Sequence, residues 1–452
     1  MKRLQAASEV ADVVDLTHEA AGVVRIDGKT VFVADALPGE QVRLRRTHRH
    51  RKVDYAVTEE VLRACADRVV PRCPHFGTCG GCALQHLAPR AQLAFKQTQL
   101  IQDLARLGGV QPDRLLEPLT GPVWYYRRRA RLGIKLVPRK GKVLVGFRER
   151  SSPYVTDLHE CHVLVEPVGA LITPLGRLVE SLSIADRVPQ AEVAVSDDVV
   201  AFVLRVLAPP TSEDLQRLAA FEQAHAVRIY LQPGGPETVA ALRTDHALPP
   251  LQYRVGDVTM EFEPTDFVQV NGVLNDAMVT RALAALELAS SDAVLDLFCG
   301  LGNFSLPLAR QAGRVVAVEG DAGLVRRARS NAERNHVTNV EFHVANLFED
   351  VVGLPWSRRS YDCVLLDPPR AGAQQVLPVV AASGARRVVY ISCHSGSLAR
   401  DAGLLVREHG FRLTAAGVMD MFPHTTHVEA MAIFDRVRPA MRIGTTKNEV
   451  QV

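Results

Sequence analysis

The sequence predicts an α/β protein whose C-terminal part is an open, mostly parallel sheet wrapped by helices. From about residue 265, short β-rich runs alternate with helical patterns, which is typical of parallel strands joined by crossover helices. The runs read AVLDLF, RVVAVE, VEFHVA, YDCVLL and RRVVYIS. A glycine-rich turn with Gly300 and Gly302 joins the first run to a helical pattern. Such a turn is a weak signal alone, so its meaning depends on the residues that end the other strands.

Length and composition set wide bounds on the class of protein. The 452 residues suit about three domains, and 47% hydrophobic residues allow sizeable cores. No apolar run approaches the roughly 20 residues of a membrane span. The N-terminal residues also lack the apolar core of a signal peptide. We therefore expect a soluble, cytoplasmic protein, and a monomer.

Residues 1–62 predict a small β-barrel. Asp27-Gly28 marks a hairpin turn between alternating apolar runs. The run RLRRTHRHRK, residues 43–52, then places six basic side chains within ten residues, although the net charge of the chain is only +3. Such a run suits a solvated loop or a phosphate-binding face, and a small barrel favours the second interpretation.

Residues 63–262 predict a central α/β domain with two notable clusters. In WYYRRRARLGIKL, residues 124–136, three aromatic residues lead into four arginines. Arginines bind phosphates and aromatic rings stack on unpaired bases, so this run indicates contact with RNA. The second cluster is CPHFGTCGGC, which with a distant fourth cysteine offers four thiols: Cys73, Cys79, Cys82 and Cys161. Crowded cysteines in a reducing compartment indicate a metal site, and this set suits either zinc or an iron–sulfur cluster.

The residues at the strand ends indicate the ligand of the parallel sheet. In open α/β sheets the ligand lies across the carboxyl ends of the strands. The second, third, fourth and fifth predicted strands end, in this order, at Glu319, Asn346, Asp367 and Cys393. A carboxylate after the second strand suits a ribose diol, whereas Ser305 stands where a dinucleotide-binding loop has its third glycine. S-adenosylmethionine, which has the ribose but no phosphate, therefore fits better than a nicotinamide cofactor.

The nature of the methyl acceptor depends on two further residues. Adenine amino-methyltransferases follow a similar DPP sequence with an aromatic residue, but here Arg370 follows. A uracil C5 is a poor nucleophile until a thiolate adds at C6, and Cys393 is suited to that addition. A general base must later remove the C5 proton, and Glu429, which opens the run EAMAIF, is the candidate.

The chain resembles the RNA (uracil-5-)-methyltransferases, most closely the bacterial 23S ribosomal RNA enzymes of this group. The resemblance rests on GKTVFVADALPGE, CPHFGTCGGC, FEPTDFVQVN, DLFCGLGNFSLPLA, LLDPPRAG, YISC and DMFPHTTHVE, which together cover nearly the whole chain. It implies a Rossmann-like S-adenosylmethionine-dependent domain over residues 263–440 and an OB-like TRAM barrel before the central domain. It also implies that the helical stretch at about 90–120 packs on the catalytic domain. The polar residues 441–452 are expected to form a loose tail.

The resemblance further implies the roles of individual residues. Cys393 is then the nucleophile and Glu429 the base, and the four cysteines named above hold a [4Fe-4S] cluster. The implied contacts to S-adenosylmethionine are Gln269, Phe298, Asn303, Glu319, Asn346 and Asp367. Arg131 and Phe267 are implied to lie near the target base, and the RNA partner is implied to be 23S rRNA.

The chain departs from the usual family sequence directly after its nucleophile. The family usually has Asn-Pro where this chain has His394-Ser395, and His394 could help to ionise the thiol.

Two other functions stay open for this chain. One alternative function is methylation of uracil in the T-loop of transfer RNA. The other is a non-catalytic RNA-binding assembly factor.

Overall fold

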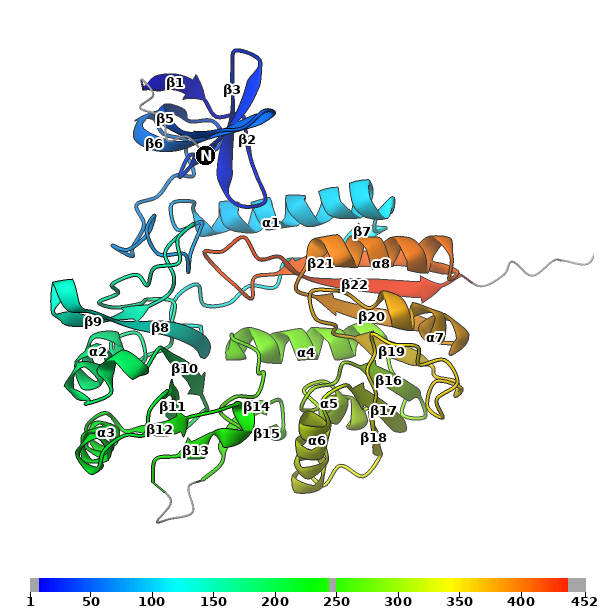
Figure 1. The fold of residues 1–452 in the computed structure, drawn as a ribbon. Coiled ribbons are helices and arrows are strands. Elements are labelled where there is room, and N and C mark those ends of the chain that lie inside the picture. Colours follow the sequence, from blue (N-terminus) through cyan, green and yellow to red (C-terminus); the bar gives the residue numbers. More distant parts are fainter. Residues whose placement is uncertain (1–7, 244–248, 438–452) are drawn as a thin grey trace, which may run out of the picture.

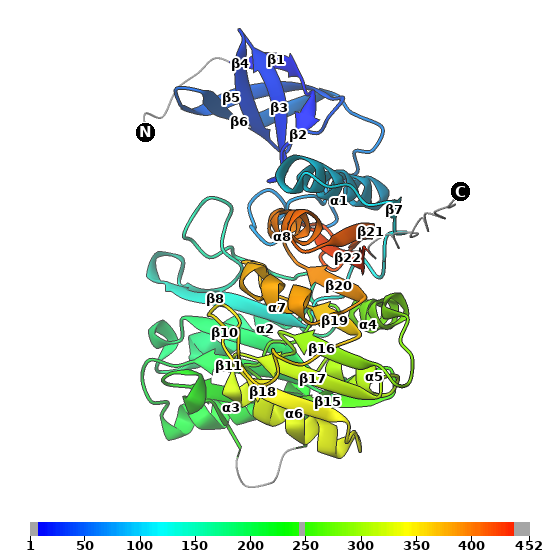
Figure 2. The ribbon, with the colours of Figure 1, turned by 90° about the vertical axis from the view of Figure 1, so that its right-hand side faces the viewer.

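The computed structural model describes residues 8–243 and 249–437, so the predicted tail lies outside the described residues. Figures 1 and 2 show a β-rich unit at the N-terminal end, a large mixed sheet with helices on both faces, and a second, smaller sheet beside it. Within the described ranges, no helix combines the length and the apolar character needed to cross a membrane.

The N-terminal unit is a curled sheet that closes on itself. The strands β1 and β2 follow each other closely in the chain and form the two edges of this sheet. Because β1 pairs with β5 and β2 pairs with β3, this one stretch of chain joins the two edges. Alternate residues point inward, and Val24, Val31 and Val42 are fully buried there. The strands are β1 Glu9–Asp12, β2 Asp15–Leu16, β3 Ala21–Ile26, β4 Lys29–Ala34, β5 Gln41–Arg49 and β6 Val53–Arg63.

The central unit is a sheet in the order β13-β12-β11-β10-β8-β9. Helices α2 Ile172–Ser181 and α3 Ser212–His225 contact each other, and their buried residues share one core with the sheet. The strands are β8 Arg129–Val137, β9 Lys142–Gly146, β10 Gln190–Val195, β11 Val200–Arg205, β12 Val227–Gln232 and β13 Ala240–Ala241.

The large sheet has the order β18-β17-β16-β19-β20-β22-β21-β7. All five predicted parallel strands form: β16 Ala293–Leu297, β17 Arg314–Glu319, β18 Val340–Val344, β19 Cys363–Leu366 and β20 Arg387–Ser392. Two long antiparallel strands, β21 Phe411–Met419 and β22 Glu429–Arg436, extend the sheet beyond β20. The predicted α/β class with a parallel sheet is therefore confirmed.

Helices cover both faces of this sheet, and each face has its own apolar core. Alternate strand residues such as Leu365 and Leu366 enter opposite cores because successive side chains of a strand point to opposite faces. One face holds α4 Gly272–Leu286, α5 Ser305–Ala309 and α6 Ala322–Arg334. The other holds α1 Pro89–Asp103, α7 Leu377–Ala382 and α8 Ser395–Arg407.

Two segments cross the domain boundaries suggested by chain order. Helix α1 precedes the central unit in sequence, yet it packs against α8, and β7 Arg114–Leu115 pairs with β21 at the edge of the large sheet. The hairpin of β14 Leu251–Val255 and β15 Val258–Phe262 shares the apolar core of the large sheet, not that of the central sheet. By its packing the hairpin therefore belongs with the large sheet, because it buries its apolar face on α4 and α6.

Candidate active site

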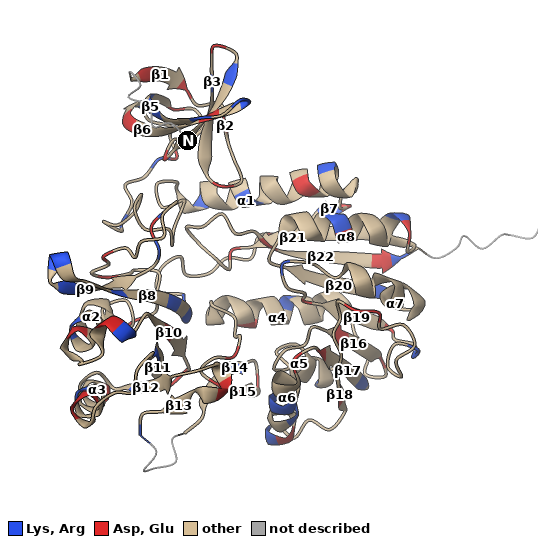
Figure 3. Ribbon diagram, in the orientation of Figure 1, with Lys and Arg blue, Asp and Glu red and all other residues tan. Residues whose placement is uncertain are grey.

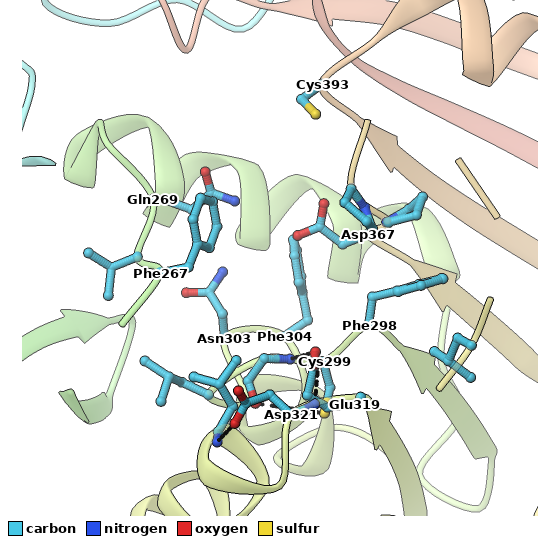
Figure 4. Close-up of a pocket in the computed structure, with 18 of the residues that line it drawn as sticks. Phe267, Gln269, Phe298, Cys299, Asn303, Phe304, Glu319, Asp321, Asp367 and Cys393 are labelled. Atoms are coloured by element: carbon cyan, nitrogen blue, oxygen red, sulfur yellow. Dashed lines mark hydrogen bonds between the residues drawn. The ribbon is translucent and has the colours of Figure 1, made fainter. Parts of the chain in front are cut away.

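A cavity of about 560 Å³ lies at the carboxyl ends of the parallel strands (Figure 4). The structure gathers there all the residues named above for S-adenosylmethionine, together with the proposed nucleophile, the proposed base and one of the two residues expected near the target base. These residues are Gln269, Phe298, Asn303, Glu319, Asn346, Asp367, Cys393, Glu429 and Phe267. Residues from distant parts of the sequence thus meet at one edge of the sheet, as its topology requires.

The glycine-rich turn after β16 forms one end of this cavity. Phe298, Gly300 and Gly302 have φ values of 66°, 55° and 91°, so the chain turns through the left-handed region that glycine adopts most easily. The carboxylate of Glu319 accepts hydrogen bonds from the backbone N–H of Gly300 at 3.1 Å and of Asp321 at 3.0 Å. These bonds fix the orientation of Glu319 at the end of β17.

Two residues of this site carried no signal in the sequence. The side-chain amides of Asn303 and Asn275 exchange two hydrogen bonds, at 2.9 and 3.0 Å, and the hydroxyl of Tyr253 also donates to Asn303. Tyr253 lies on the β14–β15 hairpin and Asn275 on α4, far from the glycine-rich turn in sequence. They hold the side chain of Asn303 at the cavity wall.

The thiol of Cys393 lies where β20 ends. Burial raises its pKa to about 11, and the nearby carboxyl groups of Glu429 and Asp367 act in the same direction. Arg370 opposes this shift, but less strongly. Burial and these two carboxyl groups therefore favour the neutral thiol of Cys393 at physiological pH.

Glu429 opens β22, and the antiparallel pairing of β20 with β22 brings it beside Cys393. Ser392 lies opposite Ala430 in this register, so the next residues along, Cys393 and Glu429, follow at the same end of the two strands. Glu429 is only 3% exposed. Burial and the carboxyl group of Asp367 raise its pKa to about 8, whereas Lys96 lowers it. A carboxylate with a raised pKa is a stronger base than an exposed glutamate.

The side chain of His394 caps helix α8. Its Nδ1 accepts the backbone N–H of Ser397 at 3.1 Å, which is the usual role of an asparagine at a helix N-cap. Burial and then Arg370 lower the pKa of His394, so the ring is neutral and its proton is on Nε2. The Nδ1 atom of His394 is thereby engaged in the helix cap and is not free to take a proton from Cys393. Ser395 in turn donates to Asp103 at the end of α1, a bond that a proline could not make.

Arg131 does not line the cavity that holds Cys393. It lies on β8, its side chain is 69% exposed, and it pairs with Glu192 at 2.8 Å. It lines a different, polar cavity of about 800 Å³ between the N-terminal unit and the central unit. Arg131 therefore lies on the central sheet and outside the cavity of Cys393.

The basic run of residues 43–52 is partly neutralised within its own sheet. Arg43 pairs with Glu60, and Arg45 pairs with Glu59. Arg46 is buried and pairs with Glu9 and Asp54. Three cations near the turn between β5 and β6 are exposed and have no such pair among the described residues: Arg49, Arg51 and Lys52.

The four clustered cysteines line one small cavity of about 20 Å³. Phe76, Phe147 and Leu158 complete its apolar wall. Burial raises the pKa of all four thiols, to about 12 for Cys82 and about 11 for Cys161. In the described part of the chain, no three His, Cys, Asp or Glu side chains stand in an arrangement that would hold a single metal ion.

The sheet and its cavity define the class of protein as an α/β class I methyltransferase. The family model described as tRNA (Uracil-5-)-methyltransferase matches residues 213–437. A relative from Alkalilimnicola ehrlichii, described as 23S rRNA (uracil(1939)-C(5))-methyltransferase RlmD, is 53% identical over 93% of this chain and 95% of its own. A relative of the same description from Xanthomonas oryzae pv. oryzae is 48% identical over 94% and 96%. The chain belongs to the RNA (uracil-5-)-methyltransferase family.

A solved structure extends the likeness in fold to nearly the whole chain. The tRNA (uracil-54, C5)-methyltransferase of Pyrococcus abyssi, solved in complex with S-adenosyl-L-homocysteine, superposes with a TM-score of 0.72. The match covers 94% of this chain and 99% of that one at 22% identity. Because a protein described as acting on tRNA has this fold, the fold by itself does not separate the two classes of RNA.

We predict that alkylation of Cys393 reports the charge of its neighbours. Iodoacetamide reacts with the thiolate, so below a pKa of about 11 the rate rises with pH, about tenfold per unit. Glu429→Gln removes a carboxylate that raises the pKa of Cys393, so alkylation at pH 9 becomes faster. Peptide mapping by mass spectrometry measures the label at Cys393. Glu341→Gln, on the edge strand β18, is the control, and equal rates in both variants would contradict the assignment.

Proposed function

We propose that this chain transfers a methyl group from S-adenosylmethionine to C5 of a specific uridine in 23S rRNA. The observation that carries the proposal is the meeting of Cys393 and Glu429 in one cavity with the six residues named for the methyl donor. The relatives described as 23S rRNA methyltransferases support the choice of RNA, since they match over nearly their whole length.

The residues of the cavity fit the methyl donor. Glu319 supplies a carboxylate for a ribose diol. The rings of Phe298 and Phe348, whose centroids are 5.8 Å apart, offer an apolar wall for adenine. Asp367, Cys393 and Glu429 form an end of the cavity whose groups have raised pKa values. A sulfonium cation placed there lowers all three pKa values and favours the thiolate, because an opposite charge stabilises the ionised form.

The proposed reaction uses Cys393 and Glu429 in succession. The thiolate of Cys393 adds to C6 of the uracil, which places electron density on C5. C5 then takes the methyl group from the sulfonium, and S-adenosylhomocysteine is the second product. Glu429 removes the remaining proton from C5, the C5–C6 double bond reforms, and the thiolate leaves by β-elimination.

The target base must leave its stack to reach the half-buried thiol of Cys393. Phe267 is 71% exposed at the cavity, so its ring is free to stack on an incoming base. Arg131 is assigned to the RNA outside the cavity, on the β8–β9 hairpin, where Lys and Arg also gather in Figure 3. The closed sheet of residues 9–63 is assigned as the TRAM-type barrel that binds RNA, with its exposed cations near the β5–β6 turn.

We assign a [4Fe-4S] cluster to the four cysteines, with zinc as the alternative. Cys73, Cys79, Cys82 and Cys161 supply four thiols around one apolar cavity. Backbone N–H groups of Val163 and Leu164 reach the sulfur of Cys161, which suits a thiolate ligand. Bound there, a cluster would cross-link the loop of Cys73–Cys82 to the segment around Cys161. Methyl transfer itself requires no redox step.

Transfer RNA is the second candidate substrate, because the matching family model is described by it. An assay of both RNAs decides. We expect the purified protein to form 5-methyluridine in 23S rRNA that lacks the modification, and not in unmodified tRNA. Cys393→Ala should abolish methylation of either RNA because the proposed reaction begins with the addition of its thiolate to C6. Methylation of tRNA alone would overturn the choice of RNA, and turnover by Cys393→Ala would overturn the nucleophile.

Glu429→Gln should stop the reaction after methyl transfer. Turnover should fall about 10²–10⁴-fold, the usual contribution of a general base. A covalent protein–RNA adduct should accumulate and be visible on a denaturing gel. Adding Cys393→Ala to this variant should remove the adduct, and the absence of any adduct in Glu429→Gln would contradict the assigned role.

The metal content of the four-cysteine site is directly measurable. Protein purified without oxygen should be brown and contain about four irons per chain. Cys82→Ser should lose iron and colour, whereas Cys65→Ser should keep both, because Cys65 does not line the cavity. A colourless protein with one zinc per chain would establish the alternative.

A further inference from the structure

Helix α1 presents two buried polar side chains that the proposed reaction does not use. Gln92 and Lys96 are each only 1% exposed, and their spacing of four residues places them on one face of the helix. The ammonium of Lys96 donates to a carboxylate oxygen of Asp420 at 2.6 Å and to the carbonyl of Phe422 at 2.8 Å. A fully buried lysine carries a large desolvation cost, so its presence requires a reason.

Both side chains act on the segment that leads to Glu429. Residues 420–428 connect β21 to β22, and Glu429 is the first residue of β22. Gln92 accepts the backbone N–H of His424 at 2.8 Å. The same segment is held from the central unit, where the hydroxyl of Tyr126 donates to the carbonyl of Pro423 at 3.0 Å. Of these contacts, the one from Lys96 brings a full positive charge.

We propose that Lys96 is a positioning residue for Glu429: it fixes the 420–428 segment through Asp420 and Phe422, and its charge favours the ionised carboxylate that accepts the C5 proton. The inference rests on the proposed function, because it assigns a task within that reaction. It places part of the control of catalysis on a helix that precedes the catalytic sheet by almost two hundred residues (α1 and β16 in Figure 1).

The groups that face Glu429 come from three elements besides its own. Asp367 follows β19 and Cys393 follows β20, and neither supplies a positive charge. Lys96 on α1 is the one cation among the groups that shift the pKa of Glu429, and it lowers that pKa, whereas burial and Asp367 raise it. Asp420 holds Lys96 in place through their ion pair. Removing the ammonium should therefore raise the pKa of Glu429 further.

A pH profile separates this task from a purely structural one. The elimination step needs ionised Glu429, so turnover rises with pH through the pKa of Glu429. In Lys96→Met we expect the midpoint to move to higher pH, with turnover at pH 7 falling about tenfold for each unit of that shift. Activity should recover towards the wild-type value at alkaline pH. Formation of a stable adduct with 5-fluorouridine RNA, in which C5 carries no removable proton after methylation, should be retained.

Two further variants complete the test. Gln92→Leu removes a contact to the same segment without changing charge, so it should leave the pH midpoint in place. Lys96→Met/Asp420→Asn removes the buried pair as a whole, which avoids leaving an unpaired carboxylate if the single variant does not fold. It should shift the midpoint in the same direction. An unshifted midpoint in the folded lysine variants would overturn the inference, whereas wild-type protein without methylation or adduct would overturn the proposed function instead.

Discussion

The antiparallel pairing of β20 with β22 is the constraint on which the site depends. It sets Ser392 opposite Ala430, so that the chain leaves β20 at Cys393 next to where it enters β22 at Glu429. A shift of the register by one residue would turn one of these side chains to the other face of the sheet. The register is held by strand residues buried on both faces, among them Tyr390 and Ile391, which are fully buried in opposite cores. The proposed nucleophile and base are thus placed together by the packing of the core.

Acidic side chains with raised pKa values gather in and around the cavity. Burial raises the pKa of Asp296 and of Asp367 to about 7 each, and Asp296 lies beneath the glycine-rich turn with its hydroxyl partner Ser305. Cys393 and Glu429 extend this group of acidic side chains towards the opening. Such groups repel one another when ionised, and a bound cation relieves that repulsion. In the proposed reaction, a bound sulfonium would therefore favour the thiolate of Cys393 as well as supply the methyl group.

Helix α1 links the two segments that carry the proposed nucleophile and base. At one end Gln92 and Lys96 hold the segment before Glu429, and at the other end Asp103 accepts the hydroxyl of Ser395, two residues after Cys393. The backbone N–H groups of Ala83 and Leu84, just after Cys82, also donate to the carbonyl of His424. Segments from the first quarter of the chain thus support both sides of the cavity. This arrangement explains why the domains are intertwined and not merely adjacent.

The sequence by itself determined the parallel strands and the residues at their ends, because strand periodicity and topology decide which residues share an edge. It offered Cys393 and Glu429 as candidates because uracil methylation needs a nucleophile and a base, and the structure places both in one cavity. It also identified the four thiols, whose cavity the structure then closed with Phe76, Phe147 and Leu158. Only the tertiary structure decided the roles of Lys96, Asn275 and Tyr253, since each meets its partner across a separation in sequence that no local pattern encodes. It also showed that Arg131 lies outside the cavity and that His394 caps a helix, because the orientation of a side chain depends on the backbone that carries it.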